Sequence, residues 1–311
     1  MFETILTEIQ KYDTIILHRH YRPDGDAMGS QIGMKHLLLE NFPGKTVYMV
    51  GDDAGYLSFM EDAVMDTVPD SAYCGALAMV LDCGGPGLVS DDRYKLADRT
   101  VRFDHHLYTG AFTDLEAIDS GFESCCGLIA QFAMEQNLKL NKLSAKSLYT
   151  GMVTDSGRFR YDSTTARTFR LAAFLMEQEF DTNEIYKDLY ADDFEDKKRK
   201  AQFILKTRFT PRRVAYICTT LEELKEMNAS VFTVSRGMVN TMADIRGTEI
   251  WANFTETENG VLCEIRSAGP NINPIAVKYG GGGHAKASGA TVKDFDTAMK
   301  MLADLDALLG E

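Results

Sequence analysis

Short apolar runs separated by longer mixed stretches make up the first half of the chain. Apolar runs of about four to eight residues bounded by polar or turn-forming residues are typical of buried β-strands, and the stretches between them have room for helices. Strands are predicted in this way at residues 14–17, 46–50, 77–81 and 100–103. Strands that alternate with helices predict an α/β fold whose parallel sheet is covered on both faces.

Helical patterns continue beyond the last of these runs. Helices are predicted at residues 31–39, 127–137, 144–154, 166–179 and 183–190. A charged stretch at 192–200 then changes from acidic to basic, as in a solvated connecting helix. We therefore expect a first domain at residues 1–187, a helical linker at 188–212 and a second domain at 213–311.

The pattern changes in the second domain. Strand-like runs at 213–218, 249–254 and 261–266 include one pair that flanks Glu258-Asn259-Gly260, a strong hairpin signal. This predicts a smaller α/β domain with a mixed sheet. Between a predicted helix at 273–279 and a predicted strand at 287–292 lie four glycines and His284. Such a run lets backbone N–H groups approach an anion closely, although glycine also dominates plain turns.

Composition narrows the class of protein. The chain has 311 residues and a net charge of −13, which argues against coating long nucleic acid, because that needs many Lys and Arg contacts to phosphates. No apolar stretch approaches the roughly 18 residues of a membrane span, and the N-terminal residues lack a signal-peptide pattern. We expect a cytoplasmic protein without membrane association. The six cysteines show no metal-ligand spacing.

Polar residues with metal-ligand chemistry follow three of the predicted strands. The carboxyl ends of parallel strands meet at one edge of a sheet, so side chains far apart in sequence converge there. Carboxylates and imidazoles suit Mn²⁺, Mg²⁺ or Zn²⁺, and one carboxylate can bridge two ions. The sequence therefore predicts a two-metal site, and its candidate ligands are His20, Asp24, Asp26, Asp82, His105, His106 and Asp155.

Each candidate also has a simpler interpretation. Asp24, Asp26 and Asp82 are placed where helix N-caps occur, and only their combination with His20 and His105 favours a metal site. For Arg158, a structural salt bridge competes with phosphate binding.

Five motifs in order carry a resemblance to a known family. They are His20-Tyr21-Arg22-Pro23-Asp24-Gly25-Asp26, Asp82, Asp104-His105-His106, Asp155-Ser156-Gly157-Arg158-Phe159 and Gly280 to His284. Together they resemble the DHH phosphoesterases that carry a C-terminal DHHA1 domain, and the resemblance covers nearly the whole chain. It implies an active site in the cleft between a DHH domain and a DHHA1 domain.

The resemblance also implies roles for individual residues. His20 and Asp24 would hold one Mn²⁺, Asp26, His105 and Asp155 would hold the other, and Asp82 would bridge the two. The spacing of the family's motif favours His20 over His18, which is left a packing role or a role in supporting the ligands. A water or hydroxide between the ions would be the nucleophile; Mg²⁺ or another divalent metal is an alternative to Mn²⁺. His106 would contact the scissile phosphate or protonate the leaving oxygen, and Asp104 would orient a neighbouring histidine. The residues expected to bind the substrate's phosphates are Arg158, Arg266, Gly281, Gly282, Gly283 and His284.

The expected activity is that of a hydrolase of phosphate esters. Members of this family with similar length and motif order degrade oligonucleotides of about two to five residues to nucleoside 5′-monophosphates and dephosphorylate 3′-phosphoadenosine 5′-phosphate (pAp). Alternatives are a phosphodiesterase for cyclic dinucleotides or linear pApA, and a catalytically inactive nucleotide-binding sensor. Long duplexes are not expected as substrates, and a homodimer is compatible with the sequence.

Overall fold

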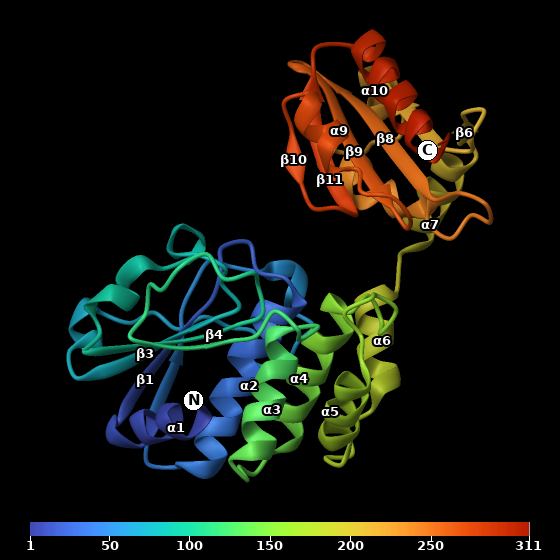
Figure 1. Cartoon of the computed structure of the whole chain (residues 1–311). Helices are drawn as coiled ribbons and strands as arrows, with labels where there is room; N and C mark the ends of the chain where they lie inside the picture. The colour runs from blue at the N-terminus through green and yellow to red at the C-terminus, as the bar shows by residue number, and fades with distance from the viewer. Residues whose placement is uncertain (311) are drawn as a thin grey trace. The chain divides into compact units, whose positions relative to one another are not determined.

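The computed structural model describes residues 1–310 and divides into two compact units (Figure 1). The first unit comprises Met1–Tyr190, and the second begins at Ala191. Each unit has its own sheet and its own hydrophobic core. Residues 1–310 include no helix with the length and apolar character that a membrane crossing needs.

The first unit is built on a five-stranded parallel sheet with the order β2-β1-β3-β4-β5. The strands are β1 (Thr14–His18), β2 (Thr46–Met49), β3 (Ala76–Leu81), β4 (Arg99–Asp104) and β5 (Leu115–Ile118). The predicted α/β fold with a parallel sheet is confirmed. The edge strand β5 was not predicted, because its four residues include a glutamate and only one is fully buried.

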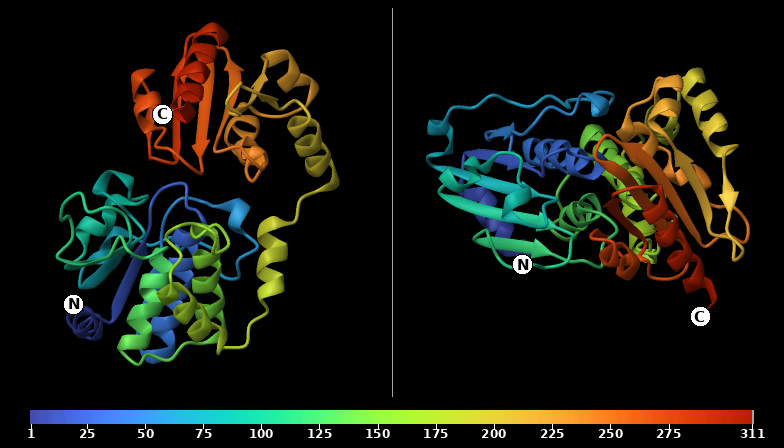
Figure 2. Two further views of the ribbon diagram at one scale, coloured as in Figure 1. Left: turned by 45° about the vertical axis from the view of Figure 1, so that its right-hand side comes forward. Right: turned by 90° about the horizontal axis from the view of Figure 1, so that it is seen from above.

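Helices cover one face of this sheet. They are α1 (Phe2–Lys11), α2 (Gly25–Asn41), α3 (Cys125–Glu135) and α4 (Lys142–Asp155). Two more helices, α5 (Ala166–Met176) and α6 (Thr182–Tyr190), pack against these helices. Figures 1 and 2 show α2, α3 and α4 side by side. Ile15 and Leu17 of β1 belong to the core that these helices share, whereas Ile16 points to the other face and packs near Tyr73.

Helices were expected on both faces of the parallel sheet, but the segments on its other face form no α-helix. The segments after β2 and β3 form only short 3-10 turns, such as η2 (Asp70–Tyr73) and η4 (Asp92–Leu96). These segments contain prolines and several glycines, which cannot sustain an α-helix at low cost. The two segments nevertheless bury Tyr73 and Tyr94 against the strands.

Glycines let α2 pack directly on α4. Gly25, Gly29 and Gly33 follow one another at a spacing of four, so they share one face of α2. A Cβ added to Gly29 would lie 2.6 Å from the carbonyl oxygen of Ser147, and one added to Gly33 would lie 2.5 Å from Leu148. The close approach brings the N-terminal end of α2 beside the C-terminal end of α4.

The second unit contains a six-stranded mixed sheet with the order β10-β11-β9-β8-β7-β6, as expected for a mixed sheet. Only β7 and β8 are parallel among its neighbouring strands. Its strands are β6 (Arg208–Phe209), β7 (Ala215–Thr219), β8 (Ile250–Thr257), β9 (Gly260–Ser267), β10 (Gly282–Gly283) and β11 (Ala287–Val292). The predicted hairpin joins β8 and β9.

Two sets of short elements cover the faces of this mixed sheet. The helices are α7 (Phe194–Ile204), α8 (Leu221–Glu226), α9 (Asn273–Lys278) and α10 (Phe295–Ala307), with a π-turn η5 (Thr233–Gly237) and a 3-10 turn η6 (Val239–Met242). Helices α9 and α10 bury one face, which includes Val261 and Ile265. On the other face η5 and η6 pack over Trp251.

Candidate metal centre

The parallel sheet brings the predicted ligands to one edge. The chain leaves β1 towards β2 on one side and later returns to β3 on the other, so the strand order reverses between β1 and β3. Ligands of open α/β sheets bind at such a reversal, outside the carboxyl ends of the strands. His20 follows β1, Asp82 follows β3 and His105 follows β4. These residues therefore meet at the position where this fold offers a site.

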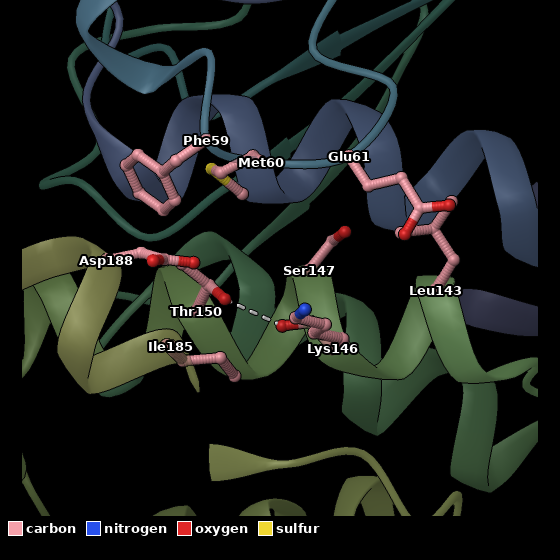
Figure 3. A pocket seen from close by; sticks show the side chains of 9 residues that line it. All are labelled: Phe59, Met60, Glu61, Leu143, Lys146, Ser147, Thr150, Ile185 and Asp188. Carbon is pink, nitrogen blue, oxygen red and sulfur yellow. Dashed lines mark hydrogen bonds between the residues drawn. The ribbon is translucent and has the colours of Figure 1, made fainter. Parts of the chain in front are cut away.

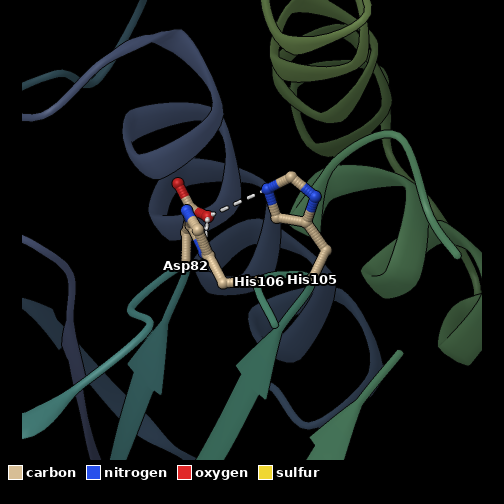
Figure 4. A group of neighbouring side chains, drawn as sticks. All are labelled: Asp82, His105 and His106. Carbon is tan, nitrogen blue, oxygen red and sulfur yellow. Dashed lines mark ion pairs between the residues drawn. The ribbon is translucent and has the colours of Figure 1, made fainter. Parts of the chain in front are cut away.

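Asp82 belongs to two of the groups of possible metal donors, and Figure 4 shows it beside His105 and His106. Its Oδ2 is 3.5 Å from His20 Nε2, and its Oδ1 is 3.5 Å from His105 Nε2. The carboxylate thus presents one oxygen to each of two groups of side chains. Oδ1 is buried and has no hydrogen-bond partner among residues 1–310. Asp82 also adopts a left-handed backbone conformation with φ of 52°, which turns its side chain at the end of β3.

One group of donors consists of His20, Asp24 and Asp82. The Nδ1 of His20 donates to the carbonyl oxygen of Tyr21 at 2.9 Å, which leaves Nε2 facing the carboxylates. Nε2 lies 3.8 Å from Asp24 Oδ1. Asp24 is also the N-cap of α2, since its Oδ1 accepts the backbone N–H groups of Asp26 and Ala27. The helix cap and the metal-ligand interpretation of Asp24 are therefore compatible.

The second group consists of Asp26, His105 and Asp155. His105 Nε2 lies 3.7 Å from Asp26 Oδ2 and 3.2 Å from Asp155 Oδ2. Asp26 is fully buried, and its two oxygens accept the backbone N–H groups of Cys125 and Cys126 at 2.7 and 2.9 Å. The N-terminus of α3 thus fixes this carboxylate and stabilises its negative charge. No sequence pattern pointed to these two amides.

The cluster has an excess of negative charge. Burial alone would lower the pKa of His20, but the carboxylates of Asp24 and Asp82 raise it to about 11. Burial likewise opposes protonation of His105, yet Asp155 and its neighbouring carboxylates raise that pKa to about 10. Burial and then the charges of Asp82 and Asp155 hold the pKa of Asp26 well above its usual range. Four carboxylates around two imidazoles create a site that attracts cations.

The donor set fits a pair of divalent metal ions. It offers only carboxylate oxygens and imidazole nitrogens, which suit hard or borderline divalent ions. The unpartnered Oδ1 of Asp82 is a buried acceptor that a cation would satisfy. His20 and Asp24 on one side and Asp26, His105 and Asp155 on the other would hold the two ions, with Asp82 shared between them.

His106 is positioned differently from His105. Its Nδ1 donates to Asp104 Oδ1 at 2.7 Å, and half of its side chain is exposed. The hydrogen bond to Asp104 raises the pKa of His106 and leaves Nε2 directed away from that carboxylate. Asp104 itself is fully buried, with the guanidinium of Arg102 at 3.9 Å from its Oδ2. His106 Nδ1 also lies 3.7 Å from Asp82 Oδ1, so His106 forms a third group of possible metal donors with Asp82 and His105. Because its Nδ1 is held by Asp104, His106 is better suited to donate a proton than to act as a seventh metal ligand.

A buried arginine supports the His20 loop and was missed in the sequence. The side chain of Arg19 is fully buried and donates to Asp52 Oδ1 at 2.9 Å and to the carbonyl oxygen of His20 at 3.2 Å. Asp52 in turn accepts the backbone N–H of Arg22. This network ties the loop that carries His20 and Asp24 to the end of β2. Its partners lie about thirty positions apart, so no local pattern could have indicated it.

The expected phosphate-binding residues are distributed over both units. Arg158 follows α4 in the first unit, and its guanidinium stacks 4.8 Å above the ring of Tyr190. Arg266 lies on β9 of the second unit. The glycine run forms β10 and a turn at His284, whose backbone N–H donates to Ala287 at 2.7 Å. The expected cleft between the two units stays a prediction.

The first unit has two cavities of interest, and only one of them is lined by a residue of the candidate site. A small cavity of about 20 Å³ between α4 and residues 59–61 is lined by residues outside the cluster and holds about one water molecule (Figure 3). A larger depression of about 400 Å³ has His106 on its wall, and its other lining residues are Met1, Tyr108, Glu116, Ile118, Asp119 and Ser120. Only the second has the position and the size of a substrate pocket.

The fold and this cluster define a class of two-unit α/β proteins with a candidate dinuclear metal centre at the carboxyl edge of a parallel sheet. Comparison with known families is more specific. A family model described as the N-terminal domain of the DHH family matches residues 14–152, and a DHHA1 domain model matches residues 222–311. The chain belongs to the DHH family and carries a DHHA1 domain, as its motifs indicated.

Similar proteins match along their whole length. The bifunctional oligoribonuclease and PAP phosphatase NrnA of Bacillus subtilis is 34% identical over 310 residues, with 99% of this chain and 98% of the relative covered. A probable NrnA of Streptococcus mutans is 36% identical, with 93% of each chain covered. The crystal structure of an exopolyphosphatase-related protein from Bacteroides fragilis has the same fold, with a TM-score of 0.86, 22% identity, and 100% of this chain and 97% of that chain covered.

Proposed function

We propose that this protein is a metal-dependent phosphoesterase that degrades short oligonucleotides to nucleoside 5′-monophosphates and dephosphorylates pAp to AMP. The names of the relatives from Bacillus subtilis and Streptococcus mutans support both activities. The observation that carries the proposal is the position of Asp82, whose two oxygens face two separate donor groups 3.5 Å away.

The residues around the cluster have distinct tasks in this reaction. Two divalent cations, when bound, would neutralise the phosphate oxygens and lower the pKa of an attacking water. Asp82 fixes the spacing of the two donor groups. Asp104 holds His106 by Nδ1, so that Nε2 can deliver a proton to the oxygen that leaves phosphorus. This division predicts that loss of His106 slows the chemical step and that loss of His105 removes metal.

The depression beside His106 favours a small leaving group. Its volume of about 400 Å³ falls within the range of small-molecule sites. Its walls include Glu116 and Asp119, whose charges disfavour a further phosphate at that place. A nucleoside therefore fits this depression better than a continuing polynucleotide, which agrees with short substrates and with a net charge of −13.

We propose Mn²⁺ as the metal and two ions per chain. Oxygen and imidazole donors in this proportion are compatible with Mn²⁺, whereas an all-oxygen site would favour Mg²⁺. Metal content of the purified protein, measured by mass spectrometry of the elements, tests the number of ions. An Asp26→Ala variant is the matched control, because it removes one ligand of the second group and leaves His20 and Asp24 in place.

A substrate panel tests the proposed function. End-labelled oligonucleotides from dinucleotide to decanucleotide, pAp, inorganic pyrophosphate and cyclic di-AMP are incubated with the protein and Mn²⁺. We expect fastest release of mononucleotides from the shortest oligonucleotides, AMP from pAp, and slow or no turnover of the other two compounds. Preferred turnover of cyclic di-AMP would indicate a cyclic-dinucleotide phosphodiesterase, and binding of AMP without any turnover would indicate a sensor.

A further inference from the structure

Arg102 is a fully buried arginine on β4 and lies outside the candidate metal centre. Successive strand residues point to opposite faces of a sheet, so Arg102 and Asp104 share one face, whereas Val101 and Phe103 point into the helical core on the other. Glu116 of β5 lies directly opposite Arg102 in the register of the two strands. A guanidinium group is therefore enclosed beside two carboxylates on the face of the sheet that the α-helices do not cover.

The guanidinium group of Arg102 lies between these two carboxylates without a hydrogen bond to either. Its Nη2 is 3.9 Å from Asp104 Oδ2, and its Nε is 3.6 Å from Glu116 Oε1. Within the described part of the chain, Nε, Nη1 and Nη2 have no hydrogen-bond partner, and neither has Asp104 Oδ2. Unpaired buried donors and acceptors are uncommon because nothing offsets their desolvation, so stability alone does not account for an arginine at this position.

Two aromatic rings hold the guanidinium group in place. The centre of the Phe112 ring is 4.5 Å from Arg102 Cζ, and the centre of the Tyr108 ring is 5.9 Å from the same atom. Both distances are within the range of a cation–π interaction. The two rings belong to the loop that follows His106, and the backbone N–H of Phe112 donates to Glu116 Oε1 at 3.2 Å. Arg102 is thus fixed between the sheet and the loop that begins at His106.

Three residues that line the depression beside His106 are connected to Arg102. His106 is connected through Asp104, which accepts its Nδ1–H at 2.7 Å. Tyr108 is connected by its ring and Glu116 by its carboxylate. Tyr108 is 61% exposed, whereas Arg102 has no exposed surface. A substrate can therefore contact the wall of the depression, and Arg102 acts on that wall from behind.

We propose that Arg102 is a positioning residue for proton transfer to the leaving oxygen. This inference rests on the proposed function. Arg102 attracts Oδ2 of Asp104, so that Oδ1 stays directed at His106 and the ring presents its Nε2 to the depression. A fixed donor avoids the loss of rate that a small misplacement of a catalytic group causes.

The step that Arg102 supports is the departure of the leaving nucleoside. The oxygen of a water molecule bonds to phosphorus and gives one proton to the solvent. The bond between phosphorus and the leaving oxygen breaks, and its electron pair stays on that oxygen. The proton on Nε2 of His106 then completes the hydroxyl group of the nucleoside, and His106 takes a new proton from the solvent.

Two substrates that yield the same AMP but differ in their leaving group test this role. ApA releases adenosine, whose alkoxide needs a proton, whereas the p-nitrophenyl ester of AMP releases p-nitrophenolate, which is stable without one. For Arg102→Met we expect kcat for ApA to fall about tenfold, a part of the roughly hundredfold that a positioned proton donor contributes, and kcat for the ester to change by less than about twofold. Metal content should equal that of the wild type. Equal losses on the two substrates, an unchanged kcat for ApA, or loss of metal would overturn the inference.

Three further variants sharpen the comparison. Arg19→Met is the matched control, because Arg19 is another fully buried arginine and supports the loop that carries His20. We expect this variant to lose metal and to slow both substrates equally. Arg102→Lys keeps the positive charge and should restore most of the wild-type ratio of the two rates. If Arg102→Met did not fold, Phe112→Leu, which removes one of the two rings, should lower the same ratio, and an unchanged ratio there would contradict the proposal.

A measurement without turnover separates this inference from the proposed function. In the Mg²⁺ form of the protein, proton NMR should show the hydrogen-bonded Nδ1–H of His106 at low field, and His106→Ala identifies that signal by its absence. We expect the signal to be lost or shifted in Arg102→Met, and an unchanged signal would contradict the positioning role. If the wild-type protein hydrolysed neither ApA nor the ester, the proposed function would fail, and the NMR comparison would still decide the role of Arg102.

Discussion

At the scale of single residues, the site depends on side chains that are fixed before any metal or substrate binds. His20 and His106 are each held by a hydrogen bond that their Nδ1 atom donates, which leaves Nε2 available. Asp26 is held by backbone amides. Rotation of these side chains is therefore restricted, and little ordering remains to be completed on metal binding. Asp82 differs from them because its Oδ1 has no such partner in the described part of the chain.

Asp82→Asn tests the shared ligand. Asparagine tolerates a left-handed backbone, so the fold should persist, but the amide removes the negative charge between the two donor groups. We expect the rate of pApA hydrolysis to fall on the order of a thousandfold, the upper end for a single electrostatic group. Rates are measured under single-turnover conditions, and the unfolding temperature controls for folding. Turnover close to that of the wild type would remove Asp82 from the centre of the mechanism.

Replacement by alanine should have different effects at His105 and at His106. His105→Ala removes a nitrogen that lies within 3.7 Å of three carboxylates, so we expect loss of bound metal. His106→Ala removes a half-exposed ring held by Asp104, so we expect retained metal and a chemical step slower by about a hundredfold. Elemental analysis and single-turnover rates distinguish the two variants. Equal metal loss in both would reverse the two roles.

The sequence indicated where the candidate ligands lie, but it did not indicate which groups hold them in place. His20, Asp82 and His105 follow predicted strands, and the geometry of a parallel sheet is sufficient to bring such positions together. The choice of His20 over His18 came from the motif spacing. His18 is buried and donates to the carbonyl oxygen of Asp91, and burial lowers its pKa to about 4. The partners of Asp26 could not be predicted, because they come from a distant segment with no pattern of its own.

At the scale of elements, the packing of α2 on α4 determines how close two of the candidate ligands lie. Asp26 is in the first turn of α2, and Asp155 is the last residue of α4. Glycines lie at the contact on both helices, and Gly151 of α4 lies against Cys126 and Asp26. The spacing of the α2 glycines is visible in the sequence, but the helix that they face is not, since helix packing is a long-range property.

Gly151→Ala tests this packing. The added Cβ would lie 2.2 Å from Cys126 Sγ and 2.9 Å from Asp26 Oδ1, so α3 or α4 must shift. We expect about 1–3 kcal/mol of destabilisation from overpacking and weaker metal binding, because Asp26 moves with α3. Chemical denaturation and metal titration measure the two effects. Gly44→Ala is the control, since its Cβ would meet nothing within 4 Å. Unchanged stability and metal affinity in Gly151→Ala would show that the interface adapts without cost.

At the scale of the whole molecule, the two units have separate cores and separate chemistry. Every candidate metal ligand lies in Met1–Tyr190, whereas most of the expected phosphate-binding residues lie in the second unit. The single tryptophan, Trp251, is buried in the core of the second unit. Tryptophan fluorescence therefore reports unfolding of the second unit, and total heat absorption reports both.

Removal of metal should consequently destabilise only the first unit. A ligand that binds the folded state at about a hundred times its Kd stabilises that state by about 2.7 kcal/mol. For a unit of this size the corresponding shift in unfolding temperature is about 5–10 °C. We expect a chelator to lower one calorimetric transition by this amount and to leave the fluorescence transition of Trp251 in place. If the fluorescence transition fell equally, the two units would unfold as one cooperative body, and the metal would stabilise the second unit as well as the first.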